Sequence, residues 1–169
     1  MLHPFHTLLR RLVFVLLCML ACVNPAQAWN GFVEYVVDGD TLHVRTIRSK
    51  ALHHVRVIGI DAPEICQTWG PQSRQALTQL VLHQKVEIKG RARDDYGRLL
   101  ARVAINGNDV GASMVQQGHA WSYRWRTRKG HYDAEETEAR AHTRGLFSVE
   151  PVQRPGDFRR QNGSCYPGR

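Results

Sequence analysis

Residues 37–64 read VDGDTLHVRTIRSKALHHVRVIGIDAPE, and the pattern of this stretch is the most informative about the architecture of the chain. Within it, residues 41–47 and 54–60 each alternate apolar and polar side chains, which is the pattern of a half-buried β-strand. Residues 48–50 are polar and suit the connection of a hairpin. Pro63 then bars regular structure around the end of the stretch. We therefore expect two consecutive strands with acidic residues just outside their ends.

The rest of the chain adds further strand-like and helix-like segments. The strands are expected at residues 32–37, 86–89 and 99–105, and the helices at residues 72–83, 110–117 and 132–143. A parallel α/β sheet would need strands and helices to alternate along the chain, and they do not. This order predicts a β-barrel with helices (α+β), namely a five-stranded oligonucleotide-binding (OB) barrel plus three α-helices.

The first 28 residues have the pattern of a secretory signal sequence. An arginine pair precedes an apolar stretch, residues 12–23, that is too short to span a bilayer comfortably. Ala26-Gln27-Ala28 fits the small-x-small pattern of a cleavage site. We expect export to the periplasm or the extracellular space, with a mature chain that begins at Trp29. The alternatives are an uncleaved membrane anchor and a lipid attached to Cys22.

Loss of the signal leaves 141 of the 169 residues, which is enough for one domain with a single core. We expect this domain at residues 29–150 and a tail at residues 151–169, in a protein that is monomeric by default. The formal charge falls from +8 to +6, because the signal holds two arginines and no acidic residue. A basic exported protein attracts polyanions, above all nucleic acid. Heparin-like polymers, anionic membranes and a merely solubilising surface are the alternatives.

Two cysteines, Cys66 and Cys165, remain after the signal is removed. Export to an oxidising compartment favours a disulfide between them, which would tie the tail to the segment after Glu64. In the chain-entropy model, a loop of this length stabilises the fold by roughly 4–5 kcal/mol. Two free thiols without a catalytic role are the alternative. Cysteines and histidines do not cluster at the spacing of a zinc site.

Carboxylates stand at the ends of the first strands. Asp40 follows a glycine turn and Asp61 follows a strand, so both can meet at one rim of a barrel. Calcium takes several oxygen ligands, including backbone carbonyls and waters. Asp40, Asp61 and the backbone carbonyl of Ala62 would supply three and leave room for water and a phosphate. Magnesium would use the same ligands. Asp38 is either a supporting group or a turn-forming residue.

Two arginines and a glutamate accompany these acids. Arg56 lies on the strand that leads to Asp61, and Arg98 follows a Tyr-Gly turn. A guanidinium donates two parallel hydrogen bonds to a phosphate and is always charged. Glu64, held in a rigid loop by the preceding proline, could accept a proton from an attacking water. Its alternative role is that of a salt-bridge partner. Acids and arginines together predict cleavage of a phosphodiester.

These segments resemble the staphylococcal nuclease (thermonuclease) family, and the resemblance covers residues 31–149. The matching segments are Val37-Asp38-Gly39-Asp40-Thr41, residues 56–64, Asp95-Tyr96-Gly97-Arg98, and residues 106–107, 114–120, 132, 138–141 and 145–147. The resemblance implies an OB barrel with three helices and calcium-dependent hydrolysis of DNA and RNA that leaves 3′-phosphates. By motif position, it implies the calcium ligands Asp40, Asp61 and Ala62 (backbone carbonyl), the phosphate-binding arginines Arg56 and Arg98, and the general base Glu64.

The chain departs from the family at a few positions. Ala62 stands where the best-known member has threonine, which spares the carbonyl but removes a hydroxyl. Tyr96 matches a tyrosine of the nucleotide site, and Tyr123 falls within one position of a second, so both are expected to contact substrate. Trp121 is expected to pack in the core. Trp125 lies among basic residues, where an aromatic ring can stack on a base of single-stranded nucleic acid.

The main alternative is a catalytically inactive OB-type module that binds nucleic acid. Such a module would be expected to lack some of the acids or arginines, and this chain has all five, namely Asp40, Arg56, Asp61, Glu64 and Arg98. A polyanion-binding envelope protein would not need the three acids together. A calcium-binding protein without hydrolytic activity would not explain the two arginines.

Overall fold

The computed structural model describes residues 28–125, 128–149 and 151–166. The predicted signal sequence lies outside them except for its last residue. Within the described ranges, no helix is long and apolar enough to cross a membrane.

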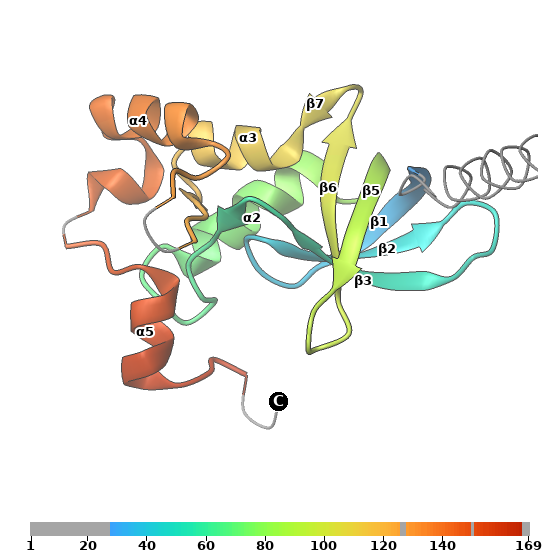
Figure 1. Ribbon diagram of the computed structural model, residues 1–169, viewed down its shortest axis with the longest axis horizontal. Helices are drawn as coiled ribbons and strands as arrows, with labels where there is room; N and C mark the ends of the chain where they lie inside the picture. Colours follow the sequence, from blue (N-terminus) through green and yellow to red (C-terminus); the bar gives the residue numbers. More distant parts are fainter. Residues whose placement is uncertain (1–27, 126–127, 150, 167–169) are drawn as a thin grey trace, which may run out of the picture.

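A closed β-barrel forms the centre of the molecule (Figure 1). Its strands are β1 (Trp29–Val36), β2 (Thr41–Thr46), β3 (Leu52–Val57), β5 (Lys85–Arg93) and β6 (Leu99–Ile105). They pair antiparallel in the order β3-β2-β1-β5-β6, and a parallel pairing between β3 and β6 closes the barrel. The short β7 (Asn108–Asp109) turns back and pairs antiparallel with β6, and β4 (Ile60–Asp61) pairs separately with β8 (Trp121–Ser122). The predicted five-stranded OB-type barrel is confirmed.

The alternation seen in the sequence places one face of each strand in the core. Val44 on β2, Val55 on β3 and Val103 on β6 are fully buried, as is Ile88 on β5. Their polar neighbours point outward, because successive side chains of a strand face opposite sides of the sheet. Burial of these apolar side chains is the main favourable contribution to folding.

Helices lie to one side of the barrel, where Figure 1 shows α2, α3 and α4. Those within the described residues are α2 (Gly70–Val81), α3 (Val110–Gln116), α4 (Asp133–Ala141), the 3₁₀ helix η1 (Gly145–Ser148) and α5 (Pro155–Asn162). Leu77 and Val81 of α2 are buried in the same core as the strands. The side chain of Asp109 caps α3 by accepting a hydrogen bond from the Ala112 amide (3.0 Å).

Helix α5 is the main difference from the sequence-based expectation, which had three helices before residue 150 and none in the tail. The helix begins with Pro155 in its first turn and ends at Asn162, and the next residue, Gly163, has a positive φ of 75°. Proline at the start and glycine past the end are the usual signals of a short helix. A disulfide between Cys66 and Cys165 joins the tail to the segment before α2, with the two Cα atoms 5.7 Å apart.

Candidate active site

The site is built around Asp40, at the start of β2. Its backbone carbonyl accepts a hydrogen bond from the Val57 amide (2.8 Å), and the next residue, Thr41, pairs with Arg56 across β2 and β3. The ladder therefore places the Arg56 side chain beside the Asp40 carboxylate. Asp61 follows a few residues later, on β4, and its backbone pairs with Trp121. Strand ends thus bring these residues together, as the sequence predicted.

One guanidinium joins the two aspartates. Nη1 of Arg56 lies 2.6 Å from Oδ1 of Asp40, and Nη2 lies 3.3 Å from Oδ1 of Asp61. Asp40 also accepts from the Thr41 hydroxyl on Oδ1 (3.0 Å) and from the Ala62 amide on Oδ2 (3.2 Å). Asp40 as a whole residue is only 3% exposed, so its carboxylate is buried. Arg56, Asp61 and Ala62 are therefore all in place around one buried carboxylate.

The acids outnumber the positive charge beside them. Burial and the neighbouring Asp40 carboxylate raise the pKa of Asp38 to about 7, and the same two causes raise the pKa of Asp61 to about 6. Burial opposes the charge of Arg56, but Asp40 and Asp61 hold the pKa of its guanidinium above the ordinary value. Crowded carboxylates with raised pKa values are stabilised by a further cation.

The chemistry of these donors fits a hard divalent cation. Carboxylate oxygens are the ligands that calcium and magnesium take, together with carbonyls and waters. Among the described residues, no group of three or more His, Cys, Asp or Glu side chains is arranged to hold a metal ion. The predicted set needs only two such side chains, Asp40 and Asp61, because the Ala62 carbonyl, water and substrate would supply the rest.

Arg98 reaches the same place from the turn between β5 and β6. The Asp94 side chain shapes this turn, since its Oδ1 accepts from the amides of Tyr96 (3.0 Å) and Arg98 (2.9 Å) and its Oδ2 from Arg98 Nε (2.8 Å). Gly97 takes a φ of 75°, which favours glycine. Nη1 of Arg98 lies 3.4 Å from the Thr41 hydroxyl, which itself donates to Asp40. Both predicted arginines therefore lie next to Thr41.

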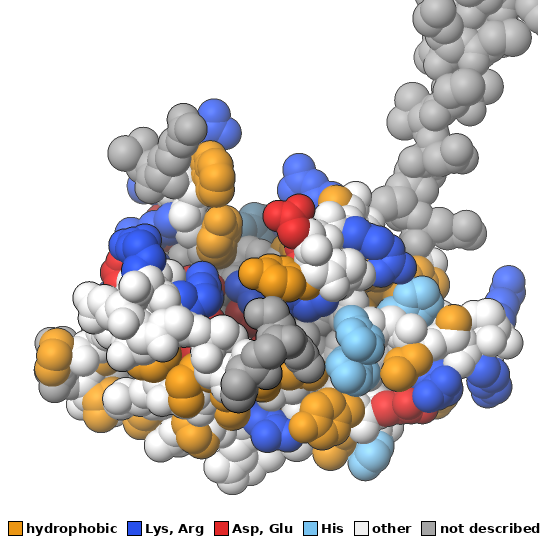
Figure 2. Space-filling view, turned by 90° about the horizontal axis from the view of Figure 1, so that it is seen from below, with side chains coloured by type: hydrophobic (Ala, Val, Ile, Leu, Met, Phe, Trp, Pro, Cys, Tyr) orange, Lys and Arg blue, Asp and Glu red, His pale blue; other side chains and the backbone are white. Residues whose placement is uncertain are grey.

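The aromatic side chains predicted to contact substrate are exposed. Tyr96 is 76% exposed, and the Arg98 guanidinium lies 5.2 Å from its ring centroid. Tyr123 is 43% exposed and follows β8, where its amide donates to the Gly59 carbonyl (2.9 Å). Trp121 is buried, as predicted for a core residue, whereas Trp125 is largely exposed. Figure 2 shows a hollow on one face of the molecule, with basic side chains around it and acidic side chains visible at its floor.

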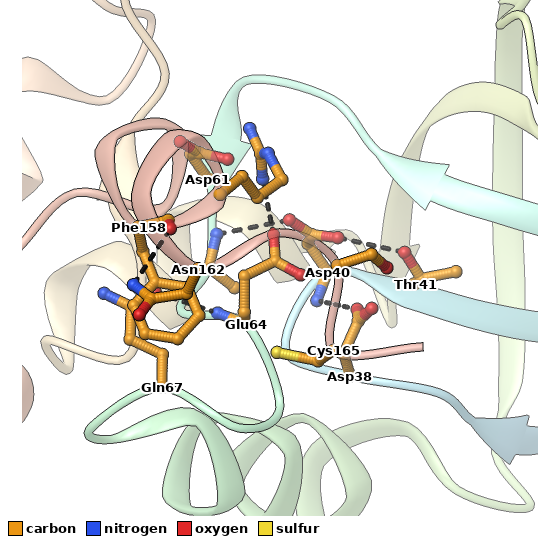
Figure 3. Close-up of polar contacts among 12 residues, drawn as sticks. Asp38, Asp40, Thr41, Asp61, Glu64, Gln67, Phe158, Asn162 and Cys165 are labelled. Carbon is orange, nitrogen blue, oxygen red and sulfur yellow. Dashed lines mark hydrogen bonds and ion pairs between the residues drawn. The ribbon is translucent and has the colours of Figure 1, made fainter. Parts of the chain in front are cut away.

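Glu64 lies in the loop between β4 and α2. Its amide donates to the side-chain oxygen of Gln67 (3.1 Å), and its carbonyl accepts from the Gln67 amide (2.8 Å). The carboxylate points toward Asp40 in Figure 3. Its Oε1 pairs with Nη1 of Arg159, which comes from helix α5. Glu64 thus joins the aspartates at the site, and it has a partner from the distant tail.

Comparison with known proteins places this arrangement in a family. Residues 54–149, more than half of the chain, match the family described as "Staphylococcal nuclease homologue". The chain belongs to this family. The matched region of this chain contains Arg56, Asp61, Glu64 and Arg98, and Asp40 lies before it. The resemblance inferred from the sequence is confirmed.

Several known proteins align with most of the length of this chain. "Protein ParB" of Escherichia coli is 36% identical over 162 residues, 88% of this chain and 89% of the relative. An "Uncharacterized endonuclease" of Haemophilus influenzae is 32% identical over 154 residues, 91% and 85% of the two chains. "Micrococcal nuclease" of Shigella flexneri is 36% identical over 150 residues, 80% and 84% of the two chains.

Three residues that hold Arg98 and Glu64 in place were not predicted from the sequence. Asp94 holds the turn that presents Arg98, Gln67 fixes the backbone of Glu64, and Arg159 pairs with the Glu64 carboxylate. Asp94 had a readable signal, because an aspartate that starts a turn commonly accepts from the amides that follow it. Gln67 and Arg159 had none.

Gly70 offers a test of how tightly the Glu64 loop is held. A Cβ at this position would lie 2.0 Å from the Glu64 carbonyl oxygen, a backbone atom that cannot swing away. We expect Gly70→Ala to lower the free energy of unfolding by about 1–3 kcal/mol, because overpacking forces the backbone to shift. Thermal unfolding measures this loss.

Gly156 provides the matched control for this substitution. A Cβ there would meet only Arg159 Nη2 at 3.8 Å, an ordinary contact, so Gly156→Ala should leave the melting temperature unchanged or raised. Equal melting temperatures for Gly70→Ala and wild type would show that the loop yields to the added methyl group.

Proposed function

We propose that this protein is a calcium-dependent nuclease that hydrolyses phosphodiester bonds of DNA and RNA. The family match and the relatives named as nucleases support a nuclease, which is a hydrolase acting on nucleic acid. The observation that carries the proposal is the Arg56 guanidinium joined to both Asp40 and Asp61, with Arg98 close by. This pairing provides ligands for a hard cation and donors for a phosphate in one place.

In the proposed site, calcium would be held by Asp40, Asp61 and the Ala62 carbonyl. When bound, it supplies a Lewis acid that polarises the phosphate. Magnesium is a second candidate for the same ligands. Asp38 hydrogen-bonds to the Asp40 amide (3.1 Å) and steadies the turn that presents the Asp40 carboxylate.

The arginines would bind the scissile phosphate and stabilise its developing charge. Arg56 uses one N–H of each Nη atom on the aspartates, so its remaining N–H groups are available to phosphate oxygens. Arg98 would support the leaving oxygen. Preorganised donors of this kind strengthen as charge develops in the transition state, so they increase the rate and not only binding.

Glu64 would accept the proton of the attacking water. Its carboxylate lies beside the aspartates on a loop fixed by Pro63 and Gln67, so a water held there is in reach of the phosphate. Attack by that water breaks the bond between phosphorus and the 5′ oxygen, which leaves a 3′-phosphate and a 5′-hydroxyl. The attacking water gives its proton to Glu64, and the leaving 5′ oxygen takes up a proton from solvent; Glu64 then returns its proton to bulk water, so the step balances.

Tyr96 and Tyr123 are the proposed contacts to neighbouring nucleotides. Both side chains are substantially exposed, Tyr96 beside Arg98 and Tyr123 directly after the strand that pairs with β4, and an aromatic ring stacks on any base. Stacking requires bases that have left the duplex, so single-stranded or frayed regions should be favoured. We also propose that the protein is exported, which rests on the signal pattern of residues 1–28, and that it acts as a monomer, which is the default for a single domain of this size.

Removal of calcium tests the proposed function. The purified protein is incubated with single-stranded and double-stranded DNA and RNA, with calcium, with magnesium or with a chelator. We expect cleavage with calcium that stops on chelation and returns when calcium is added in excess, and end-group analysis should find 3′-phosphates.

The same assay separates the alternatives. Binding without cleavage under both metals would indicate the catalytically inactive binding module. Cleavage that continues in the presence of chelator would contradict the proposed role of calcium.

A further inference from the structure

We propose that Arg159 is a positioning residue for Glu64, and that the Cys66–Cys165 disulfide keeps it there. This inference rests on the proposed function of Glu64 as the group that accepts a proton from water. It assigns a role in that reaction to helix α5, a segment outside the residues that match the family.

The contact itself joins residues 95 positions apart in the chain. Nη1 of Arg159 donates to Oε1 of Glu64, whose side chain is 16% exposed. A glutamate side chain has several rotatable bonds, and an unpaired carboxylate on a loop would sample many orientations. The ion pair occupies Oε1 and selects one of them, which leaves Oε2 to face a water. Charge-assisted hydrogen bonds from arginine combine strength with fixed geometry.

Helix α5 is attached to the Glu64 loop on both sides. Before the helix, the Gln153 carbonyl accepts a hydrogen bond from the side-chain amide of Gln67 (2.5 Å). After it, Cys165 forms the disulfide with Cys66. Arg159 lies between these two attachments, and its partner Glu64 lies in the same short loop. Three links therefore join one loop to one helix, and the helix cannot move away while they hold.

The chain past the helix adds a further contact to the acidic turn. The Tyr166 hydroxyl donates to the Val37 carbonyl (3.3 Å), one residue before Asp38. Figure 3 shows Phe158 and Asn162 of α5 beside Glu64 and Gln67. The tail thus follows the site from the Glu64 loop to the start of β2.

The next residue of the same helix provides a matched control. Arg160 pairs with Asp157 within α5, and its side chain is 77% exposed. Arg159 and Arg160 therefore share a helix, a charge and a surface location, and differ in whether they contact Glu64. Exposed ion pairs contribute little to stability, so neither alanine variant should prevent folding.

The test compares Arg159→Ala, Arg159→Lys and Arg160→Ala with the oxidised wild-type protein. Cleavage of a fluorescent single-stranded oligonucleotide in saturating calcium gives kcat and KM, and a thermal melt confirms folding. We expect Arg159→Ala to lower kcat by about 10- to 100-fold with KM changed less than about twofold, because a misplaced catalytic group costs rate more than binding. Arg159→Lys should recover part of kcat, and Arg160→Ala should match wild type.

The disulfide is tested in the same assay. Reduction of the wild-type protein and the double substitution Cys66→Ser with Cys165→Ser should each lower kcat toward the value of Arg159→Ala. Reductant should change neither the double variant nor, beyond a small factor, Arg159→Ala, because residues that act through one contact are not additive. Thiol labelling verifies the redox state of each sample.

Four outcomes would overturn the inference. Equal kcat for Arg159→Ala and Arg160→Ala would overturn it while the proposed function stands. A rise in KM alone would show that Arg159 binds substrate instead. A rise in kcat would show that the ion pair keeps Glu64 from its water. A folded wild-type protein that cleaves nothing would overturn the proposed function, and this inference with it.

Discussion

Replacing Arg56 with lysine is expected to lower kcat by about 10³-fold or more, the range typical of a transition-state arginine. Lysine keeps the charge, but its single nitrogen cannot join Asp40 and Asp61 and also bind a phosphate, as the Arg56 guanidinium can. The loss should therefore appear chiefly in kcat, because planar bidentate donation matters most when charge develops on the phosphate. Steady-state cleavage of a defined oligonucleotide measures it.

Arg45→Lys is the matched control. Arg45 lies on the neighbouring strand β2, and its guanidinium pairs with Glu34 and the Lys50 carbonyl, at the opposite end of that strand from Asp40. This variant should retain wild-type rates. If Arg56→Lys also cleaved at the wild-type rate, the simultaneous contact of Arg56 with Asp40 and Asp61 would not be needed for cleavage, and the proposed function would lose its main support.

Replacing Glu64 with glutamine is expected to lower kcat by about 10²–10⁴-fold, the range typical of a lost general base. The amide has nearly the same shape, and its oxygen can still accept from Arg159, so orientation is kept while proton acceptance is lost. The backbone contacts to Gln67 do not involve the changed group. KM should change little, which separates this effect from a loss of binding.

Glu87→Gln controls for the loss of one negative charge. Glu87 is exposed near the start of β5, where it pairs with Ala104 at the end of the ladder away from the turn that carries Arg98, and this variant should cleave at the wild-type rate. If Glu64→Gln also cleaved at that rate, the proton would have to go elsewhere, and the role proposed for Arg159 would lose its basis.

The barrel and the first three helices could be predicted from the sequence because their signals are local. Alternation along residues 41–47 and 54–60 reports which face is buried, and the structure buries Val44 and Val55 accordingly. Helix α5 was not predicted, because a helix of 8 residues is marginal by itself and depends on its attachments. Those attachments join it to a loop about 90 residues earlier, as in the pair Gln67 and Gln153.

The candidate site likewise has residues that the sequence predicts and residues that it does not. Asp40, Arg56 and Asp61 stand at strand ends, so their meeting follows from the order of the strands. Arg159 is one of 23 basic residues, and nothing in its local sequence distinguishes it from Arg160. Its partner is set by the path of the tail, which only the folded molecule reveals.

The parallel pairing of β3 with β6 has a consequence for the newly made chain. It sets Arg56 opposite Leu100, and so brings the turn that carries Arg98 to Arg56. These residues are far apart in sequence, and contacts of this kind form late and slowly during folding. A chain in which this last ladder is still open has its two arginines on separate segments and no assembled site. In the export proposed above, a chain that is kept unfolded would therefore lack the assembled site and could not cleave the nucleic acid of the cell that makes it.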